Sequence, residues 1–330
     1  MTTATATPVQ ATLAQLHRLL DAGQALSPTY RGELSNHLPM AQQALLELGA
    51  SAARLQAFTE RYEALLEPRA ATRPARIVQA RDLGRPDSDN AWRAHFAGRV
   101  AAVGPGEALR EALAMLLPGA GAVAFHGLIR TAHAVLAGHE AELAAGLAHW
   151  AAHFMPLPAA TRPADLALTD WLDALLALPR PDERGGLITA RMRAWAAAPG
   201  FADVAGRLRH GPDTLRDLAL LAARTYAATG NFTVLHLLTA SHAMSVLEPW
   251  WPRAELPRGF SIAAAAGLLA SGATPSPALD HPPSRPWPAL IAGACEQDDA
   301  HVIKLTHAAW RLGRRWPDLA WRRAVERALA

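Results

Sequence analysis

Apolar residues recur at three- and four-residue intervals along almost the whole chain of 330 residues, and no stretch alternates apolar and polar residues as a half-buried strand would. Alanine, leucine, arginine and glutamate are frequent, and all four favour helices. With 51% hydrophobic and only 18% charged residues, the chain can bury a large core and is not intrinsically disordered. We predict an all-α fold, a single large multi-helix domain of more than ten helices over residues 1–330.

Start and stop signals mark the ends of several predicted helices. Ser51 can cap one helix, and Gly230-Asn231 separates two others. Asp298 and Asp299 begin a helix near the C-terminus, where carboxylates accept hydrogen bonds from free N–H groups and suit the helix dipole. The predicted helices cover residues 13–20, 39–48, 55–66, 109–117, 122–137, 140–154, 166–178, 203–209, 214–228, 232–247, 262–269, 287–295, 299–314 and 319–329.

Two segments, 67–90 and 249–288, are rich in proline and are predicted to be irregular. The second segment also carries Trp250, Trp251 and Trp287. A long loop in a compact domain is often a lid or a binding loop, and these tryptophans are then candidate walls for a flat substrate. The alternative is a connection whose tryptophans simply pack on the helices, and the sequence leaves both open.

Composition excludes several classes of protein. The single cysteine, Cys295, excludes a disulfide scaffold and a cysteine-built zinc site. No apolar run reaches the roughly 18 residues of a membrane span, and the first residues lack the pattern of a signal peptide. We therefore expect a cytoplasmic protein without a membrane partner. The net charge is +3, but the arginines are scattered among acidic residues, so we expect no nucleic-acid partner.

Lys304 is the only lysine among 32 basic side chains, and the other 31 are arginine. Such a bias is typical of a GC-rich genome that encodes arginine where lysine would also serve. A lysine that survives the bias is either a mutational accident or a residue whose task arginine cannot perform. Composition alone does not decide between the two.

The histidines of the apolar helices fall into four separate motifs. His126 and His133 are seven residues apart, about 10 Å along a helix, so they can hardly bind one ion together. His301 and Lys304 have the i, i+3 spacing of paired ligands in helical bundles. The spacing thus selects one histidine per motif together with the His301/Lys304 pair, although a single histidine in a helix is more often a satisfied core residue. The motif histidines are His37, His126 with His133, His236 with His242, and His301 with His307.

Lysine becomes a useful metal ligand only when its amine is neutral. Burial lowers the pKa of an amine, and the neutral amine can take up carbon dioxide to give an anionic carbamate. Four neutral imidazoles and one carbamate leave an iron(II) site at net +1, with room for dioxygen or substrate. Arginine cannot do this because it stays protonated, which gives Lys304 a physical reason to persist.

At these motifs the chain resembles the questin oxidase-like family, and the resemblance extends from residue 36 to residue 308. Each motif is short, but their order and spacing together are specific. The matching stretches are Asn36-His37, Phe125-His126-Gly127-Leu128-Ile129-Arg130, Leu235-His236-Leu237-Leu238-Thr239 and Asp299-Ala300-His301-Val302-Ile303-Lys304.

Fungal members of that family oxidise anthraquinone-type polyketides by Baeyer–Villiger-like oxygen insertion or oxidative ring cleavage. For one branch the resemblance implies a non-haem iron held by four histidines and a carboxylated lysine. Carried over by motif, the ligands are His37, His126 and His236, with Lys304 as the carboxylated lysine. Spacing from Lys304 selects His301 as the fourth histidine.

The chain departs from the fungal pattern at one position. Fungal relatives often carry a second histidine where this chain has Arg130, one turn after His126. Either His133 or His242 compensates for the missing ligand, or Arg130 orients an anionic oxygen or a substrate enolate. We therefore expect Arg130, His133 and His242 to be catalytic residues around the metal.

The expected function is that of a metal-dependent oxidoreductase, an oxygenase that uses non-haem iron(II) and dioxygen on an aromatic or polyketide-like ketone. Two alternatives remain. A metallohydrolase with a carboxylated lysine usually has a His-x-His on a strand, and the chain has neither. A helical interaction protein without chemistry predicts that Lys304→Met has no metal phenotype. The sequence does not indicate the oligomeric state.

Overall fold

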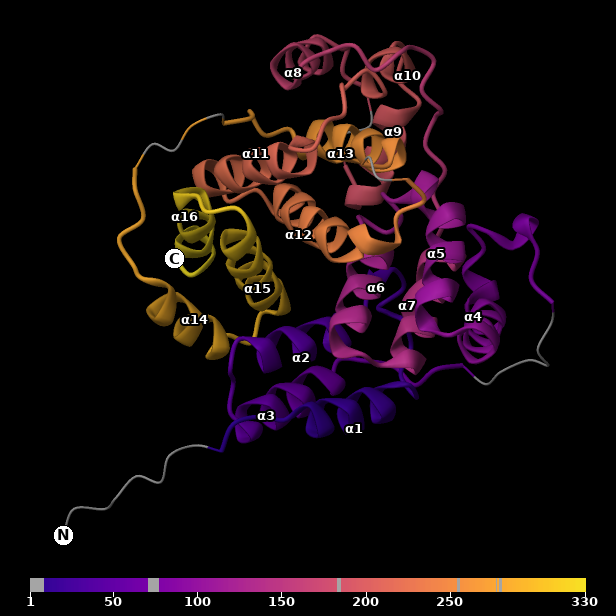
Figure 1. The fold of residues 1–330 in the computed structure, drawn as a ribbon, viewed down its shortest axis with the longest axis vertical. Coiled ribbons are helices and arrows are strands. Elements are labelled where there is room, and N and C mark those ends of the chain that lie inside the picture. The colour runs from indigo at the N-terminus through magenta and orange to yellow at the C-terminus, as the bar shows by residue number, and fades with distance from the viewer. Residues whose placement is uncertain (1–8, 71–76, 183–184, 254–255, 277, 279–280) are drawn as a thin grey trace.

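The computed structural model describes residues 9–70, 77–182, 185–253, 256–276, 278 and 281–330, and helices dominate these parts of the chain (Figure 1). Two two-residue strands, β1 (Thr29–Tyr30) and β2 (Leu34–Ser35), pair antiparallel. The helices are α1 (Leu13–Gly23), α2 (Leu38–Glu47), α3 (Ala52–Glu63), α4 (Asp89–Val103), α5 (Pro105–Leu116), α6 (His126–Ala137), α7 (Glu140–Ala152), α8 (Leu168–Leu176), α9 (Ile188–Ala196), α10 (Phe201–Ala205), α11 (Thr214–Thr229), α12 (Phe232–Leu247), α13 (Arg258–Ser271), α14 (Trp287–Cys295), α15 (Ala300–Arg315) and α16 (Leu319–Ala328). Short 3-10 helices cover Ala80–Asp82, Pro86–Ser88, Leu117–Gly119 and Glu248–Trp250.

The predicted all-α fold is confirmed, and three predicted helix starts carry the expected caps. The Ser51 hydroxyl accepts a hydrogen bond from the Arg54 amide at the start of α3. The Asp299 carboxylate accepts the His301 amide at the start of α15, whereas Asp298 instead forms ion pairs on the surface. Asn231, after Gly230, caps α12 through its side-chain oxygen.

Three parts of the helix prediction were wrong. The helices α4 and α9 were not predicted, and residues 122–125 form a turn instead of the first turn of α6. Segment 249–288 is irregular only on either side of α13, a buried helix of 14 residues, and segment 67–90 holds short 3-10 helices and the start of α4. Residues 1–8, 71–76, 183–184, 254–255, 277 and 279–280 of the predicted domain lie outside the described residues.

Four helices surround the centre of the molecule. Helix α2 packs against α6 and α15, and α12 packs against the same two helices, so the four form a closed ring (Figure 1). Helices α7, α11, α13 and α16 lie outside this ring and cover it. Because α12 is covered on nearly every side, almost all of its residues are buried, as expected for a helix that is apolar all round.

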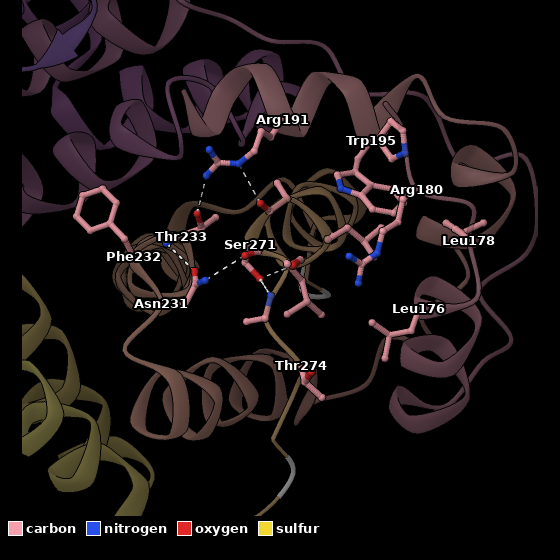
Figure 2. A pocket seen from close by; sticks show the side chains of 16 residues that line it. Leu176, Leu178, Arg180, Arg191, Trp195, Asn231, Phe232, Thr233, Ser271 and Thr274 are labelled. Atoms are coloured by element: carbon pink, nitrogen blue, oxygen red, sulfur yellow. Dashed lines mark hydrogen bonds between the residues drawn. The ribbon is translucent and has the colours of Figure 1, made fainter. Parts of the chain in front are cut away.

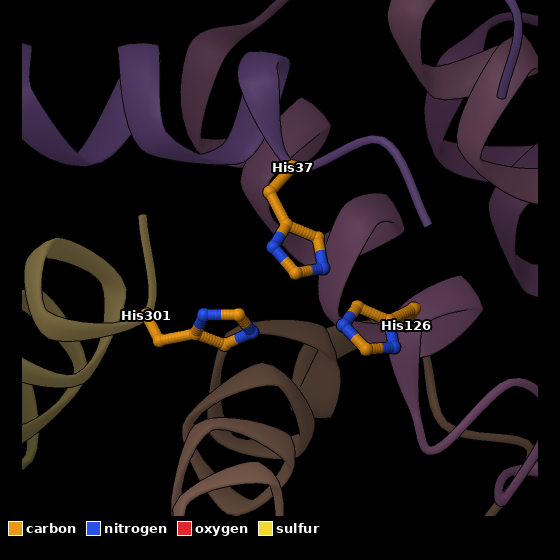
Figure 3. Close-up of side chains that lie close together, drawn as sticks. All are labelled: His37, His126 and His301. Carbon is orange, nitrogen blue, oxygen red and sulfur yellow. The ribbon is translucent and has the colours of Figure 1, made fainter. Parts of the chain in front are cut away.

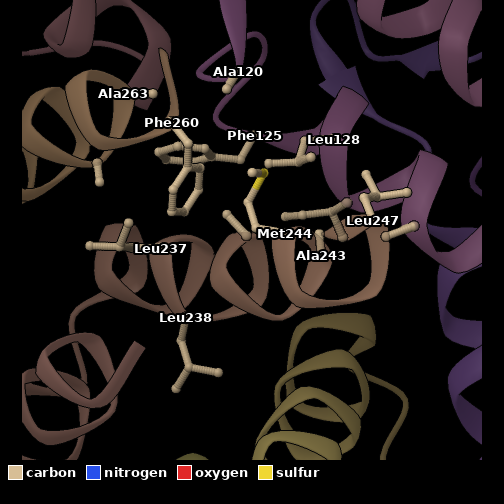
Figure 4. Packing of buried hydrophobic residues seen from close by; sticks show 14 of the residues in the cluster. Ala120, Phe125, Leu128, Leu237, Leu238, Ala243, Met244, Leu247, Phe260 and Ala263 are labelled. Carbon is tan, nitrogen blue, oxygen red and sulfur yellow. The ribbon is translucent and has the colours of Figure 1, made fainter. Parts of the chain in front are cut away.

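The apolar core lies beside the ring. Met244 of α12 points toward Phe125 and Leu128 at the start of α6, and Phe260 of α13 lies over the same turn (Figure 4). Helices α6 and α7 approach closely where Gly127 faces Trp150, since a Cβ atom added at Gly127 would lie 2.6 Å from the Trp150 Cβ. In the described chain, no helix combines the length and the apolar character that a membrane crossing needs.

Candidate metal centre

The four histidines predicted as ligands meet at one end of the helix ring. His37 caps α2, His126 is the first residue of α6, His236 lies on α12, and His301 is near the start of α15. Their ring centroids form a closed circuit, with 4.6 Å from His37 to His126, 4.9 Å from His126 to His236, 5.4 Å from His236 to His301 and 4.5 Å from His301 to His37. One nitrogen from each of His37, His126 and His301 lies within 4.8 Å of the others (Figure 3). Three of the four predicted histidines thus have nitrogens close enough to share one ion, whereas His236 is close to them by ring-centroid distance but lies outside this group.

Hydrogen bonds leave ring nitrogens free to bind a metal. In the neutral rings, Nδ1–H of His126 donates to the Val123 carbonyl and Nδ1–H of His236 donates to the Phe232 carbonyl at 2.8 Å. The His301 Nδ1–H donates to the Asp299 carboxylate at 3.0 Å. Each of these rings then keeps an unprotonated Nε2, and the buried Nε2 of His126 has no hydrogen-bond partner. This is the donor set that a metal ion requires, with backbone or carboxylate groups holding the outer nitrogens.

Burial also favours the neutral, ligand-ready form of the rings. The side chains of His37, His126 and His236 are buried, and desolvation lowers the pKa of each of them well below its usual value. Desolvation likewise lowers the pKa of His301, although its side chain is 20% exposed. At neutral pH the four imidazoles therefore carry no charge and present lone pairs.

Lys304 lies one turn after His301 and is only 1% exposed. Burial lowers the pKa of its amine from 10.5 to about 7. The charge of the protonated amine is close enough to lower the pKa values of His37, His126, His236 and His301. A large fraction of the amine is therefore neutral near pH 7, and it lies beside the four rings.

Local backbone features place two of the histidines. The Asn36 side chain accepts the Leu38 amide at 2.9 Å and donates to the Ser27 carbonyl at 3.0 Å, which fixes the start of α2 next to His37.

The segment before His126 is strained. Val123, Ala124 and Phe125 have φ values of 43°, 54° and 68°, in the left-handed region that costs a non-glycine residue roughly 1–2 kcal/mol. This strain is most unusual at Val123, because its β-branched side chain tolerates positive φ poorly. The turn aims the Val123 carbonyl at the His126 ring, and strained backbone of this kind is found at functional sites.

A cavity of about 620 Å³ lies beside the start of α12, and its described lining contains none of the four histidines. Phe232 lines this cavity, and its ring also contacts His236 at 4.8 Å and His301 at 4.7 Å between centroids. In Figure 2 the Phe232 ring points away from the other lining residues. Phe232 is therefore the residue that links the lining of the cavity to the surroundings of the histidines. The remaining lining includes Leu176, Leu178, Arg180, Arg191, Trp195, Asn231, Thr233, Ser271 and Thr274.

The structure places the three predicted catalytic residues away from the four rings. The Arg130 guanidinium forms a buried, bidentate ion pair with Glu142 at 2.6 and 3.0 Å. His133 and His242 belong to a second group of buried histidines, together with His307. Their catalytic role stays a prediction.

The tryptophans of segment 249–288 do not wall the cavity beside Phe232. Trp250 lines a smaller cavity of about 230 Å³ beside α5, and Trp287 packs against Gly313. The described lining of both cavities also lacks Trp251.

Three residues of this region were not predicted as site residues: Phe232, the carboxylate Asp299 behind His301, and His307. His307 had a signal, since it follows Lys304 by three residues just as Lys304 follows His301.

Comparison with known proteins supports the motif resemblance. A search of curated proteins finds no match to this chain. The sequence profile of the questin oxidase-like family matches residues 34–309, a stretch that contains all five predicted ligands. An oxidase-like family implies oxidoreductase activity on a small molecule. The chain therefore belongs to the questin oxidase-like family.

Proposed function

We propose that this protein is a non-haem iron(II) oxygenase that uses dioxygen to oxidise an aromatic or polyketide-like ketone. The observation that carries the proposal is the closed circuit of four neutral imidazoles, three of which have nitrogens within 4.8 Å of one another, together with a buried lysine one turn after His301. The donor set fits a metal because three rings have their Nδ1 hydrogen bonded elsewhere and keep Nε2 free. Imidazole is a good ligand for iron, and membership of an oxidase-like family agrees with a redox metal.

In this proposal His37, His126, His236 and His301 hold the iron together with a carboxylated Lys304. When bound, iron(II) supplies the one-electron chemistry that dioxygen needs to react with an organic substrate. Asp299 fixes the His301 tautomer and raises the basicity of its Nε2. The Val123 and Phe232 carbonyls do the same for His126 and His236.

Lys304 suits carboxylation because its amine is buried beside four uncharged rings. The neutral amine nitrogen attacks the carbon of carbon dioxide, a C–N bond forms, and one proton leaves the nitrogen. The product is a carbamate with one negative charge and two oxygen donors. That charge offsets part of the charge of a divalent ion in a site whose other ligands are neutral.

The cavity beside Phe232 is the proposed substrate site. Its volume of about 620 Å³ lies within the usual range for small-molecule pockets. The exposed Phe232 ring, in contact with His236 and His301, offers a surface on which an aromatic substrate can stack. Arg191 is committed to the Ala270 carbonyl and to Thr233, so in this cavity Arg180 is the candidate for an anionic oxygen of the substrate.

Arg130, His133 and His242 enter the proposal as supporting residues. The Glu142 carboxylate compensates the charge of Arg130 and holds its side chain in place. A role for Arg130 in orienting a substrate enolate requires that Glu142 release the guanidinium.

The test is anaerobic reconstitution with iron(II), followed by metal analysis and measurement of oxygen uptake with an aryl ketone or anthraquinone. We expect bound iron and substrate-dependent oxygen uptake in the wild type. His126→Ala should lose both, whereas His281→Ala, at an exposed histidine, should keep both. Failure of the wild type to retain iron, or iron retention by His126→Ala at the wild-type level, contradicts the proposal.

A further inference from the structure

A second group of three histidines lies deeper in the helix ring. His133 of α6, His242 of α12 and His307 of α15 are 3%, 1% and 0% exposed. Their ring centroids are 5.2 to 6.2 Å apart, and one nitrogen from each lies within 4.8 Å of the others. The same three helices that carry His126, His236 and His301 thus carry a second tier.

The two tiers follow from a similar spacing on three helices, each of which carries its second-tier histidine C-terminal to its first-tier histidine. From the first tier to the second, the step is seven residues on α6 and six on both α12 and α15. At 1.5 Å per residue these steps amount to about 9–10 Å, so one ion cannot serve both tiers. Lys304 lies midway on α15, and the charge of its amine acts on His133 as well as on the first tier.

Helix α2 supplies acceptors for the second tier. The Nδ1–H of His133 donates to the Gln43 side-chain oxygen at 2.6 Å, and the Nε2–H of His307 donates to the Glu47 carboxylate at 2.7 Å. Glu47 also accepts from Arg311 at 2.8 and 3.0 Å, which balances its charge. These bonds leave Nε2 of His133 and Nδ1 of His307 without a proton.

The ring nitrogens of the second tier that do not bond to α2 have too few N–H donors among them to satisfy one another. Nε2 of His242 and Nδ1 of His307 are both buried and have no hydrogen-bond partner. Desolvation lowers the pKa values of all three rings, so each ring carries only one N–H. His133 and His307 use theirs outward, and only His242 can offer one inward. Buried acceptors left in this way are costly unless a cation or a water satisfies them.

We propose that His133, His242 and His307 form a second metal site, which binds one divalent ion of zinc type through three imidazole nitrogens. A set of nitrogen donors with no carboxylate or thiolate suits zinc, and three histidines with an open fourth position are a known zinc arrangement. Glu47 and Gln43 orient two of the ligands from behind, as carboxylates and carbonyls commonly do for metal-bound histidines. The site needs nothing from the iron proposed for the first tier.

The test is metal stoichiometry of the full chain. Metal-free protein is titrated with zinc(II) or with the spectroscopic probe cobalt(II), and bound metal is counted by mass spectrometry after gel filtration. We expect two equivalents in the wild type and one in His242→Leu. His126→Ala should also bind one, whereas the His126→Ala/His242→Leu double variant should bind none. The thermal midpoint should rise with zinc in His126→Ala but not in the double variant.

The variants keep this proposal separate from the proposed function. His126→Ala removes only the first site, so the equivalent bound at the second site should persist in this variant. His307→Gln provides an independent variant of the second site in case His242→Leu does not fold. Far-ultraviolet circular dichroism checks that both variants are folded. The second site is refuted if well-folded His126→Ala binds no metal at saturation, or if well-folded His242→Leu and His307→Gln both bind as many equivalents as the wild type.

Discussion

Replacing Lys304 by methionine separates the structural cost of the lysine from its chemical role. The amine has a pKa of 10.5 in its ordinary environment and about 7 when buried in the fold. A shift of 3.5 units at roughly 1.4 kcal/mol per unit amounts to about 5 kcal/mol of folding free energy. Methionine has a similar length and carries no charge, so Lys304→Met removes this cost in the metal-free protein.

The pH dependence gives the sign. Above pH 10.5 the amine is neutral in both the folded and the unfolded chain, so no free energy is spent on burying a charged amine. As the pH falls from 10.5 toward 7, the unfolded chain binds a proton that the folded chain does not, and stability decreases. Below pH 7 both forms are protonated, and the cost stays constant at its maximum.

Urea unfolding of the two metal-free proteins, in carbonate-free buffer at several pH values, measures the effect. We expect Lys304→Met to be more stable than the wild type at pH 7 by several kcal/mol, with a difference that shrinks steadily toward pH 10.5. Bicarbonate should stabilise only the wild type, because only it can form a carbamate. With metal the order should reverse, since the variant loses a ligand. Parallel pH profiles for the two metal-free proteins would refute the reasoning.

The remaining predictions concern packing, a buried charge and substrate access. Gly127→Ala should lower the free energy of unfolding by about 1–3 kcal/mol, measured by urea titration, because the new methyl group meets the backbone of Trp150. Glu142→Gln should cost about 3–5 kcal/mol by the same assay, since it leaves Arg130 charged and buried without its partner; a change below 1 kcal/mol would contradict the buried ion pair. Phe232→Ala should raise KM for an aromatic substrate several-fold and leave bound iron unchanged, and an unchanged KM would place the substrate elsewhere.

The sequence predicted the helices well where an amphipathic pattern met a clear cap. Helix α12 begins and ends where expected, after Asn231, and α14 matches in full. Helix α4 was missed although its buried apolar residues Trp92, Phe96 and Val100 recur every four residues. Residues 122–125 were predicted as helix, yet Val123, Ala124 and Phe125 have positive φ and form a turn before His126. Alanine, valine and phenylalanine give no local signal for such a turn, so propensity could not predict it.

The first histidine tier could be proposed from the sequence because four motifs each offered one candidate histidine, and because His301 and Lys304 have the i, i+3 spacing of paired ligands. Its convergence depends on how α2 and α12 pack, which spacing does not give. The second tier was missed for the opposite reason. His133 and His242 were treated as companions of the first tier, although a step of six or seven residues along three helices, with His307 as the third member, was visible in the chain.

The helix ring has a consequence for how the protein opens. Its members α2, α6, α12 and α15 come from widely separated parts of the chain, from residue 38 to residue 315. In the metal-free protein we expect α2 to detach together with α1 and α3 while the rest stays folded, so amide hydrogens there should exchange with solvent by a partial opening. An ion bound across the ring penalises every opening that separates these helices. Amide exchange in all four should then slow together and approach the rate set by global unfolding.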